Sequence, residues 1–350
     1  MTSGKADGSR NQAGDYSIES IEASEAKWDA RANSQQQKAG RFALAATCLG
    51  PAAVLLLALQ VVIFHRESPY AWLLISSELA LLAIVLAIGY TGIGPNPKEW
   101  AKARIRAEIL RREKFLLKNR IGPYLGLENP GSEIHRRLNM IDMEEIDPVK
   151  LLPLSDAQGH WRDHLEDSRH APLAESDLID KIRDYATNRI EDQLKFYRSR
   201  THRNHRRNEV LESSAKAALL LALIFSVVHL LFVVMPYPTD DSRFAGWEKV
   251  ITIVSLSLPP FIATIAGWQS FYQPLRLKLS YQSQAEALTL LANELSRLED
   301  KVSSGKEPRD AASGARYFRE FKRIVLRAEE VMANEQIQWW MLINSWTPST

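Results

Sequence analysis

The stretch from Ala215 to Met235 reads AKAALLLALIFSVVHLLFVVM, and only one lysine, one serine and one histidine interrupt its predominantly apolar character. A buried helix of a soluble protein seldom stays apolar all round for so long, whereas about 20 such residues cross a hydrocarbon layer of ~30 Å. A short polar loop separates this stretch from a second one, so that predicted spans lie at about 214–236 and 247–272. The pair predicts a transmembrane hairpin.

The first half of the chain contains the same arrangement, with further apolar stretches at about 42–64 and 70–92. In each half a basic, aromatic-led helix precedes the spans and a helix with an Ala-Glu-x-Leu motif follows them. The paired motifs are Trp28-Asp29-Ala30-Arg31 with Ala107-Glu108-Ile109-Leu110, and Tyr197-Arg198-Ser199-Arg200 with Ala285-Glu286-Ala287-Leu288. An internal repeat usually decides the architecture. The sequence therefore predicts an all-α membrane protein with two repeats of helix, two-span transmembrane hairpin and cytoplasmic heptad-like helix.

The composition between the spans predicts the domain boundaries. We expect a disordered tail over residues 1–15, because this segment is small, polar and rich in glycine, with the first helix starting near Ser17. A first two-span repeat follows over 16–125. Residues 126–180, which contain four prolines, predict a cytoplasmic linker with short helices. Residues 181–350 predict the second two-span repeat, which ends in a C-terminal helical hairpin.

The placement of the basic residues predicts the topology. Lysine and arginine flank the inner ends of the spans at Lys98, Lys102, Arg104, Arg106, Arg111 and Arg112 and at Lys195, Arg198, Arg200, Arg203, Arg206 and Arg207. The two hairpin loops contain almost none. Cationic residues next to spans stay in the cytoplasm, so both termini and the central segment are expected there and both hairpins point outward.

A seven-residue period marks the helices that follow the spans. Its positions are Ala103, Leu110, Leu117 and Tyr124 in the first half and Tyr281, Leu288, Leu295 and Val302 in the second. This stride is typical of a helix that packs along another helix. Two interpretations stay open: a bundle within one chain, and coiled-coil association into a homo-oligomer.

No motif for enzymatic chemistry is present. The chain lacks a phosphate-binding GxxxxGK[ST] loop, a GxGxxG fingerprint, a GxSxG elbow and a paired CxxC, and it has a single cysteine, Cys48. His160 and His164 have helical spacing but no evident third metal ligand, so a solvated loop is favoured. We expect no catalytic residues, no cofactor and no metal.

The basic stretch before the third span consists of Arg198, Arg200, Arg203, Arg206 and Arg207. It adjoins a span and contains few interleaved aromatic residues. Contact with anionic membrane lipids is therefore favoured, and no nucleic acid is expected as a partner.

Several polar residues lie within the outer layer of the predicted spans: Glu78, His229, Gln60, Ser255 and Ser257. An ionisable group at such depth costs several kcal/mol unless it pairs or meets water. One interpretation is a structural hydrogen bond from Glu78 to His229 or to a serine, and the other is a hydrated pore constriction lined by Glu78. Pro259 and Pro260 predict a kink that suits a gate or only shapes packing.

The layout resembles the SMODS- and SLOG-associating two-transmembrane effector (SLATT) domains. The resemblance rests on Tyr197-Arg198-x-Arg200, the two spans, Ala285-Glu286-x-Leu288 and Glu335-x-x-x-Trp339. The first half, from Trp28 to Leu125, resembles a second member, which would make a tandem pair. The resemblance implies a bacterial membrane effector of a conflict or defence system against viruses, and it supplies no catalytic residues.

These observations predict a multi-pass protein of the bacterial inner membrane that forms an oligomeric, membrane-permeabilising pore. Its cytoplasmic helices would gate the pore on a signal from a separate sensor protein or a nucleotide. The alternative is a non-conducting membrane scaffold that recruits cytoplasmic partners. A small transporter is less favoured, because two hairpins leave little room for alternating access.

Overall fold

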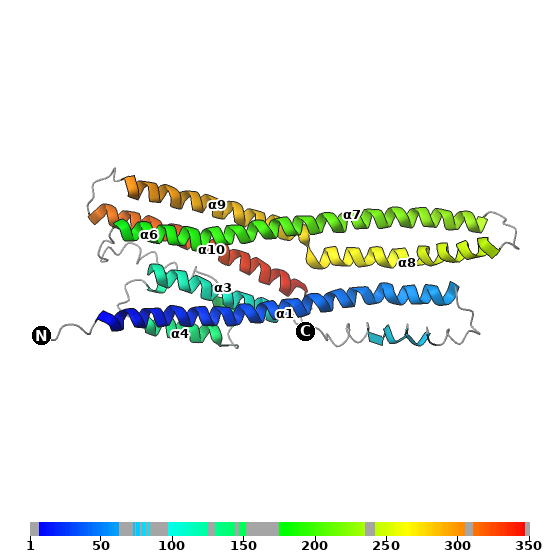
Figure 1. The fold of residues 1–350 in the computed structure, drawn as a ribbon, viewed down its shortest axis with the longest axis horizontal. Helices are drawn as coiled ribbons and strands as arrows, with labels where there is room; N and C mark the ends of the chain where they lie inside the picture. Colours follow the sequence, from blue (N-terminus) through cyan, green and yellow to red (C-terminus); the bar gives the residue numbers. More distant parts are fainter. Residues whose placement is uncertain are drawn as a thin grey trace. The chain divides into compact units, whose positions relative to one another are not determined.

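The computed structural model describes residues 7–62, 73, 75–77, 79–81, 83–84, 97–124, 130–143, 147–151, 175–234, 242–304 and 311–346. Every described element is helical, as the sequence predicts (Figure 1). The predicted span at 70–92, with Glu78, lies largely outside these residues, and His160 and His164 lie outside them entirely.

The chain divides into two compact units. The first, here called the charged unit, contains Met1–Gln36, Asn96–Arg200 and Ser280–Thr350. The second, the apolar unit, contains Gln37–Pro95 and Thr201–Leu279. Each unit combines segments from both halves of the sequence, and the predicted repeat with its domain boundaries stays a prediction.

The long helices are α1 (Asp7–Val62), α7 (Asp192–Val234), α8 (Ser242–Tyr272), α9 (Pro274–Ser304) and α10 (Ala311–Trp346). Between them lie α3 (Pro97–Asn119), η1 (Gly122–Tyr124), α4 (Gly131–Asp142), η2 (Pro148–Leu151), α6 (Glu175–Tyr185) and the π-helical segment η3 (Ala186–Glu191). Helix α1 includes residues 7–15, which the sequence predicts to be disordered, and so begins earlier than the expected start near Ser17. A helix that is already nucleated extends at low cost, which accounts for these polar turns.

Proline sets the start of two helices. Pro97 and Pro274 each occupy the first position of their helix, where the missing N–H is not needed. The residue before Pro274 is Gln273, which has a φ of 39°. Because proline disfavours right-handed helical backbone in the preceding residue, α8 ends there and α9 begins a new helix.

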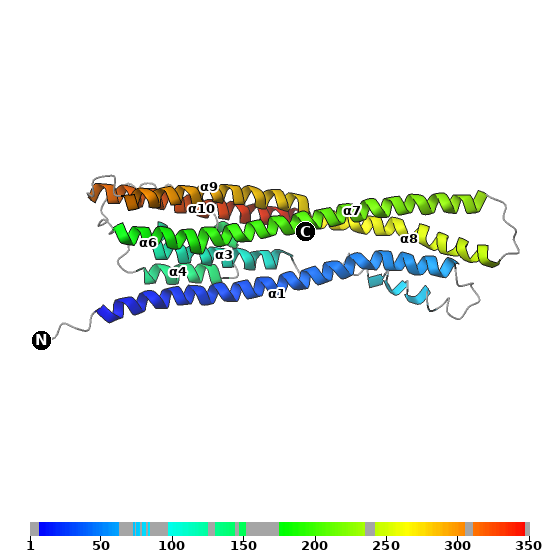
Figure 2. The ribbon, with the colours of Figure 1, turned by 45° about the horizontal axis from the view of Figure 1, so that its top comes forward.

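In the charged unit, α1 and α3 lie antiparallel. Three ion pairs join them: Asp29–Arg104 at 2.6 Å, Glu25–Arg111 at 2.8 Å and Glu22–Lys114 at 3.2 Å. Helices α9 and α10 form an antiparallel hairpin, joined by Glu294–Arg327 at 3.4 Å and Lys301–Glu320 at 3.6 Å (Figure 2). Helix α10 therefore runs back along α9.

The core of the charged unit contains the seven-residue seam. All eight of its positions are buried, and Leu110, Leu288 and Leu295 are completely inaccessible. Tyr197 of α7 stacks on Tyr281 of α9 with ring centroids 5.9 Å apart. The seam thus packs within one chain, which is one of the two interpretations that the sequence leaves open.

The apolar unit consists of helix segments that hide little of their surface. Three described helical stretches, Ile18–Gln60, Glu175–Leu231 and Gly246–Ser304, are long and apolar enough to cross a membrane. They contain the predicted spans at 42–64, 214–236 and 247–272 almost completely. Leu220, Leu223 and Leu230 of α7 each expose more than half of their surface. Such exposure fits a lipid environment better than water.

Candidate functional site

The structure places four of the five predicted intramembrane polar residues. His229 of α7 lies opposite Thr252 of α8, with 3.4 Å between His229 Nδ1 and Thr252 Oγ1. The Thr252 hydroxyl donates its proton to the carbonyl of Glu248 at 2.8 Å, so the ring nitrogen is the donor in the histidine contact. The partner of His229 in the described residues is therefore a threonine, which the sequence analysis did not single out. The predicted Glu78–His229 bond involves a residue outside them.

Three polar atoms in the described part of the apolar unit are buried without a hydrogen bond: Thr201 Oγ1 and two atoms within the predicted spans. Gln60 Oε1 and Ser255 Oγ have no partner among the described residues. An unsatisfied buried polar atom costs about 1–3 kcal/mol, so these two positions would gain from water or from another chain. Ser257 differs, because its hydroxyl donates to the carbonyl of Ile253 in its own helix at 2.7 Å.

The proline pair does not interrupt α8, which the structure describes as continuous from Ser242 to Tyr272. Thr264 donates from its hydroxyl to the carbonyl of Pro260 at 2.9 Å. Near the C-terminal end of the helix, Trp268 Nε1 donates to Thr47 Oγ1 of α1 at 2.6 Å. This bond ties α1 to α8 inside the apolar unit, and nothing in the sequence pattern predicts it.

A buried charge cluster lies in the charged unit and was also missed by sequence reasoning. Arg189 of η3 makes two hydrogen bonds to Glu329 of α10, at 2.9 and 2.7 Å. Tyr185 donates to the same carboxylate at 3.0 Å, and Arg189 Nη1 lies 3.9 Å from Glu108 of α3. The buried charge cluster consists of these four residues and joins four helical segments, α3, α6, η3 and α10.

Glu108 is held as a carboxylate by its neighbours. Arg104 and Arg111 each approach it to 2.8 Å on the same helix. Burial opposes ionisation, but these two arginines and Arg189 outweigh the burial and lower the pKa of Glu108. An adjoining cavity of about 20 Å³ has room for one water molecule and not for an organic ligand.

Two further buried groups titrate near neutrality. Burial and the nearby Glu108 raise the pKa of Glu335 to about 8, against the opposing influence of Arg104 and Arg200. Burial lowers the pKa of Lys322 to about 8, and its ammonium lies 4.2 Å from the ring centre of Phe318. Neither group forms an ion pair among the described residues, so both are neutral over part of the physiological range.

The predicted lipid-facing arginines lie along the exposed side of α7, with one exception. Arg198, Arg203, Arg206 and Arg207 are exposed. Arg200 is half-buried and lies over the ring of Phe196, 5.1 Å from its centre. Four of the five positions are thus available for contact with lipid, and the contact itself stays a prediction.

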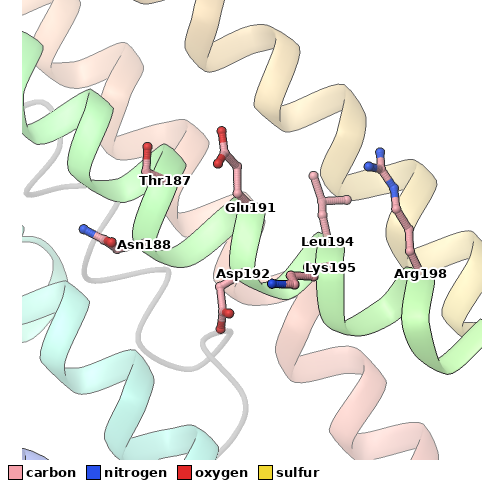
Figure 3. A pocket seen from close by; sticks show the side chains of 7 residues that line it. All are labelled: Thr187, Asn188, Glu191, Asp192, Leu194, Lys195 and Arg198. Atoms are coloured by element: carbon pink, nitrogen blue, oxygen red, sulfur yellow. The ribbon is translucent and has the colours of Figure 1, made fainter.

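A groove of about 860 Å³ runs along η3 and the start of α7 (Figure 3). Its described lining consists of Thr187, Asn188, Glu191, Asp192, Leu194, Lys195 and Arg198. The side chains of Glu191 and Asp192 point to different sides of the helix. Because two carboxylates and two cations line the groove, it does not favour a ligand of either charge. The described residues contain no group of three side chains placed to hold a metal ion.

These features define an all-helical protein with helices of membrane-spanning length and a charged helical unit, and they suggest a membrane location. Residues 185–241, which include η3 and α7, match the family model described as SMODS and SLOG-associating 2TM effector domain 1. The model matches one such domain, and the predicted tandem arrangement stays a prediction. Neither a curated protein nor a solved structure matches the chain.

Proposed function

We propose that this chain is an effector of the bacterial inner membrane whose copies assemble into a membrane-permeabilising pore. The match of residues 185–241 to a two-transmembrane effector domain supports the class. The observation that carries the pore is the pair of buried polar atoms, Gln60 Oε1 and Ser255 Oγ, on helices of spanning length. Polar groups in hydrocarbon are costly unless they face water or a partner, and an oligomeric pore supplies both.

The charged unit would lie in the cytoplasm and receive the activating signal from a separate sensor protein or a nucleotide. The buried charge cluster supports this assignment, because it joins α3, η3 and α10 through bonds that a conformational change has to break together. Signal transfer requires such an element with two arrangements that the ligand can bias.

Dye leakage from vesicles tests the pore. The full chain is reconstituted into liposomes filled with a self-quenching dye, and leakage is compared for wild type, Ser255→Ala and Glu78→Gln. If these polar groups line a wet passage, both variants reduce or alter the leakage while insertion is unchanged. Ser257→Ala is the matched control, because Ser257 already bonds its own helix and its loss should leave leakage unchanged.

The runner-up function is a non-conducting membrane scaffold, favoured by the exposed, mixed-charge groove on η3 and α7. A scaffold would leave the vesicles sealed in wild type and in every variant. Absence of wild-type leakage at saturating protein, with correct insertion, would contradict the pore and leave the scaffold.

A further inference from the structure

A second group of basic residues joins the predicted lipid-facing arginines at the end of the apolar unit. Lys278 Nζ of α9 lies 3.2 Å from His205 Nδ1 of α7, which places the first turn of α9 level with the middle of the basic stretch. The basic collar, as we call it, consists of Arg203, Arg206 and Arg207 of α7 and Arg276 and Lys278 of α9. All five belong to the apolar unit.

Apolar side chains are exposed within the same collar. Val210 is 56% exposed, Leu275 is 52% exposed and Leu279 is 57% exposed. A single exposed leucine is ordinary on a protein in water, but three large apolar groups interleaved with five cations form the pattern of a surface in the interface of a bilayer. There the cations reach phosphate groups while the apolar side chains enter the acyl boundary.

The distance from the apolar segment fits this placement. Helix α8 ends at Tyr272, and Arg276 follows only four residues later, which span at most about 14 Å even when fully extended. Arginine side chains at this distance reach the headgroup layer, and the surface potential of anionic lipids acts over about 10 Å.

Nearby carboxylates leave most of the collar's charge available. His205 Nε2 lies 3.4 Å from Glu209, and Glu212 pairs with Lys216 at 2.6 Å. Arg203, Arg206 and Arg276 have no ion pair among the described residues. The collar therefore presents a net positive surface at the end of the spans.

We propose that the basic collar binds the headgroups of anionic phospholipids in one leaflet and so fixes the depth of the hairpin formed by α7 and α8. The inference rests on the membrane location in the proposed function and does not require a pore. It adds Arg276, Lys278 and the exposed leucines of α9 to the lipid contact that the sequence predicts for α7 alone.

The association of spin-labelled lipids tests the proposal. The full chain is reconstituted in phosphatidylcholine vesicles containing either spin-labelled phosphatidylglycerol or spin-labelled phosphatidylcholine, and the motionally restricted fraction is measured. Wild type should prefer phosphatidylglycerol. R203Q/R206Q/R276Q should lower that preference at least about fivefold, because each basic residue near an anionic surface strengthens lipid binding by about that factor. The preference should fall at high salt and survive millimolar inorganic phosphate, which separates a lipid site from a site for free phosphate.

R297Q/R319Q/R323Q is the matched control, because it removes three exposed arginines from the charged unit. This control should keep the preference. An unchanged preference in the collar variant would overturn the proposal, and so would equal loss in both variants. Binding of a single-stranded oligonucleotide that displaces the lipid would also overturn it, in favour of nucleic acid. This assay measures lipid preference, whereas the dye assay described above measures leakage. A protein that shows the preference without causing leakage would contradict the pore and leave the lipid site intact.

Discussion

Arg189 and Glu329 are separated by 140 residues along the chain and meet through two parallel hydrogen bonds, with the arginine 2% exposed and the glutamate 1% exposed. Two charges leave water only if each finds its partner in good geometry, and removing one partner strands the other. The pair is bidentate, and the Tyr185 hydroxyl also donates a hydrogen bond to the Glu329 carboxylate. This contact fixes the register of η3 against α10 more strictly than apolar packing would.

Helical spacing alone is enough to predict the arginine partners of Glu108 on α3, although not the buried charge cluster itself. Arg104, Glu108 and Arg111 stand four and three residues apart, which places them on one face of a helix and predicts their mutual ion pairs. The partner of Arg189 was not predictable, because the sequence does not specify which distant carboxylate α10 brings to η3. The same holds for the Thr47–Trp268 bond in the apolar unit.

Glu335 makes the stability of the charged unit dependent on pH. Its folded-state pKa of about 8 lies above its ordinary value of 4.5, so its contribution to stability is fully present below pH 4.5 and is lost as the pH rises through 8. Glu335→Gln should remove this loss and flatten the pH profile of the free energy of unfolding, by at most about 1.4 kcal/mol per pH unit within that window.

Chemical unfolding at a series of pH values measures the effect. Glu330→Gln is the control, since Glu330 lies on the same helix and is exposed. A wild-type profile in Glu335→Gln would show that the Glu335 carboxyl is ionised in the folded protein and that its pKa is not raised.

At the scale of the helix, the seven-residue seam was predictable and its partners were not. Periodicity alone gave all eight buried positions, because a helix packed along another must repeat its apolar residues in that stride. It left open whether the partner helix belongs to the same chain. The ion pairs between α9 and α10 answer this for α9, since they bring the two helices together inside one unit.

The end of α3 shows a helix stop that the sequence did not indicate. Arg120 has a φ of 52°, its N–H donates to the carbonyl of Leu117 at 3.0 Å, and the N–H of Ile121 donates to the carbonyl of Leu116 at 2.9 Å. This is the Schellman arrangement, which glycine usually closes. An arginine at that position gives no stop signal to a reader of the sequence.

Replacing Leu288 and Leu295 with aspartate should unfold the charged unit. Both residues are completely inaccessible within the chain, and a buried unpaired carboxylate belongs to the most damaging class of substitution, above about 4 kcal/mol. Association of subunits through the seam, the other interpretation of the sequence, predicts a milder result, loss of the oligomer with insertion unaffected. Circular dichroism and limited proteolysis distinguish the two outcomes.

Leu290→Asp is the matched control on α9, because Leu290 is 67% exposed. It should leave the fold intact. If cross-linking shows that this variant alone loses the oligomer, subunits associate through the exposed side of α9 and not through the seam.

At the scale of the whole molecule, spans were easier to predict than their arrangement. Length and apolar composition identified three helices that the structure describes, since a helix must satisfy its own backbone to cross hydrocarbon. The division into a charged and an apolar unit was not predictable, because the charged unit combines three separate segments of the sequence and the apolar unit combines two. Contacts between distant segments decide it.

The topology gives a prediction for the intact protein. The asymmetry of lysine and arginine places residues 1–40, 95–213 and 274–350 in the cytoplasm and both hairpin loops outside. Reporter fusions after Glu67 and Asp241 should therefore show external exposure, while fusions after Gly131 and Lys306 should not. A cytoplasmic signal from either hairpin loop would contradict four spans.

The π-helical segment Ala186–Glu191 has a consequence for chain length. A π turn holds one more residue than an α turn, and each residue of an α-helix turns the chain by about 100°. Deleting a single residue here would convert the π turn into an α turn. The 43 residues of α7 could then keep the same side chains on the same side of the helix. The same loss within α7 would swing everything beyond it by about 100° and carry lipid-exposed leucines to another side. Within the described helical run from Glu175 to Val234, the π-helical segment is thus a stretch where a change in length can be absorbed without turning the exposed leucines of α7 to another side.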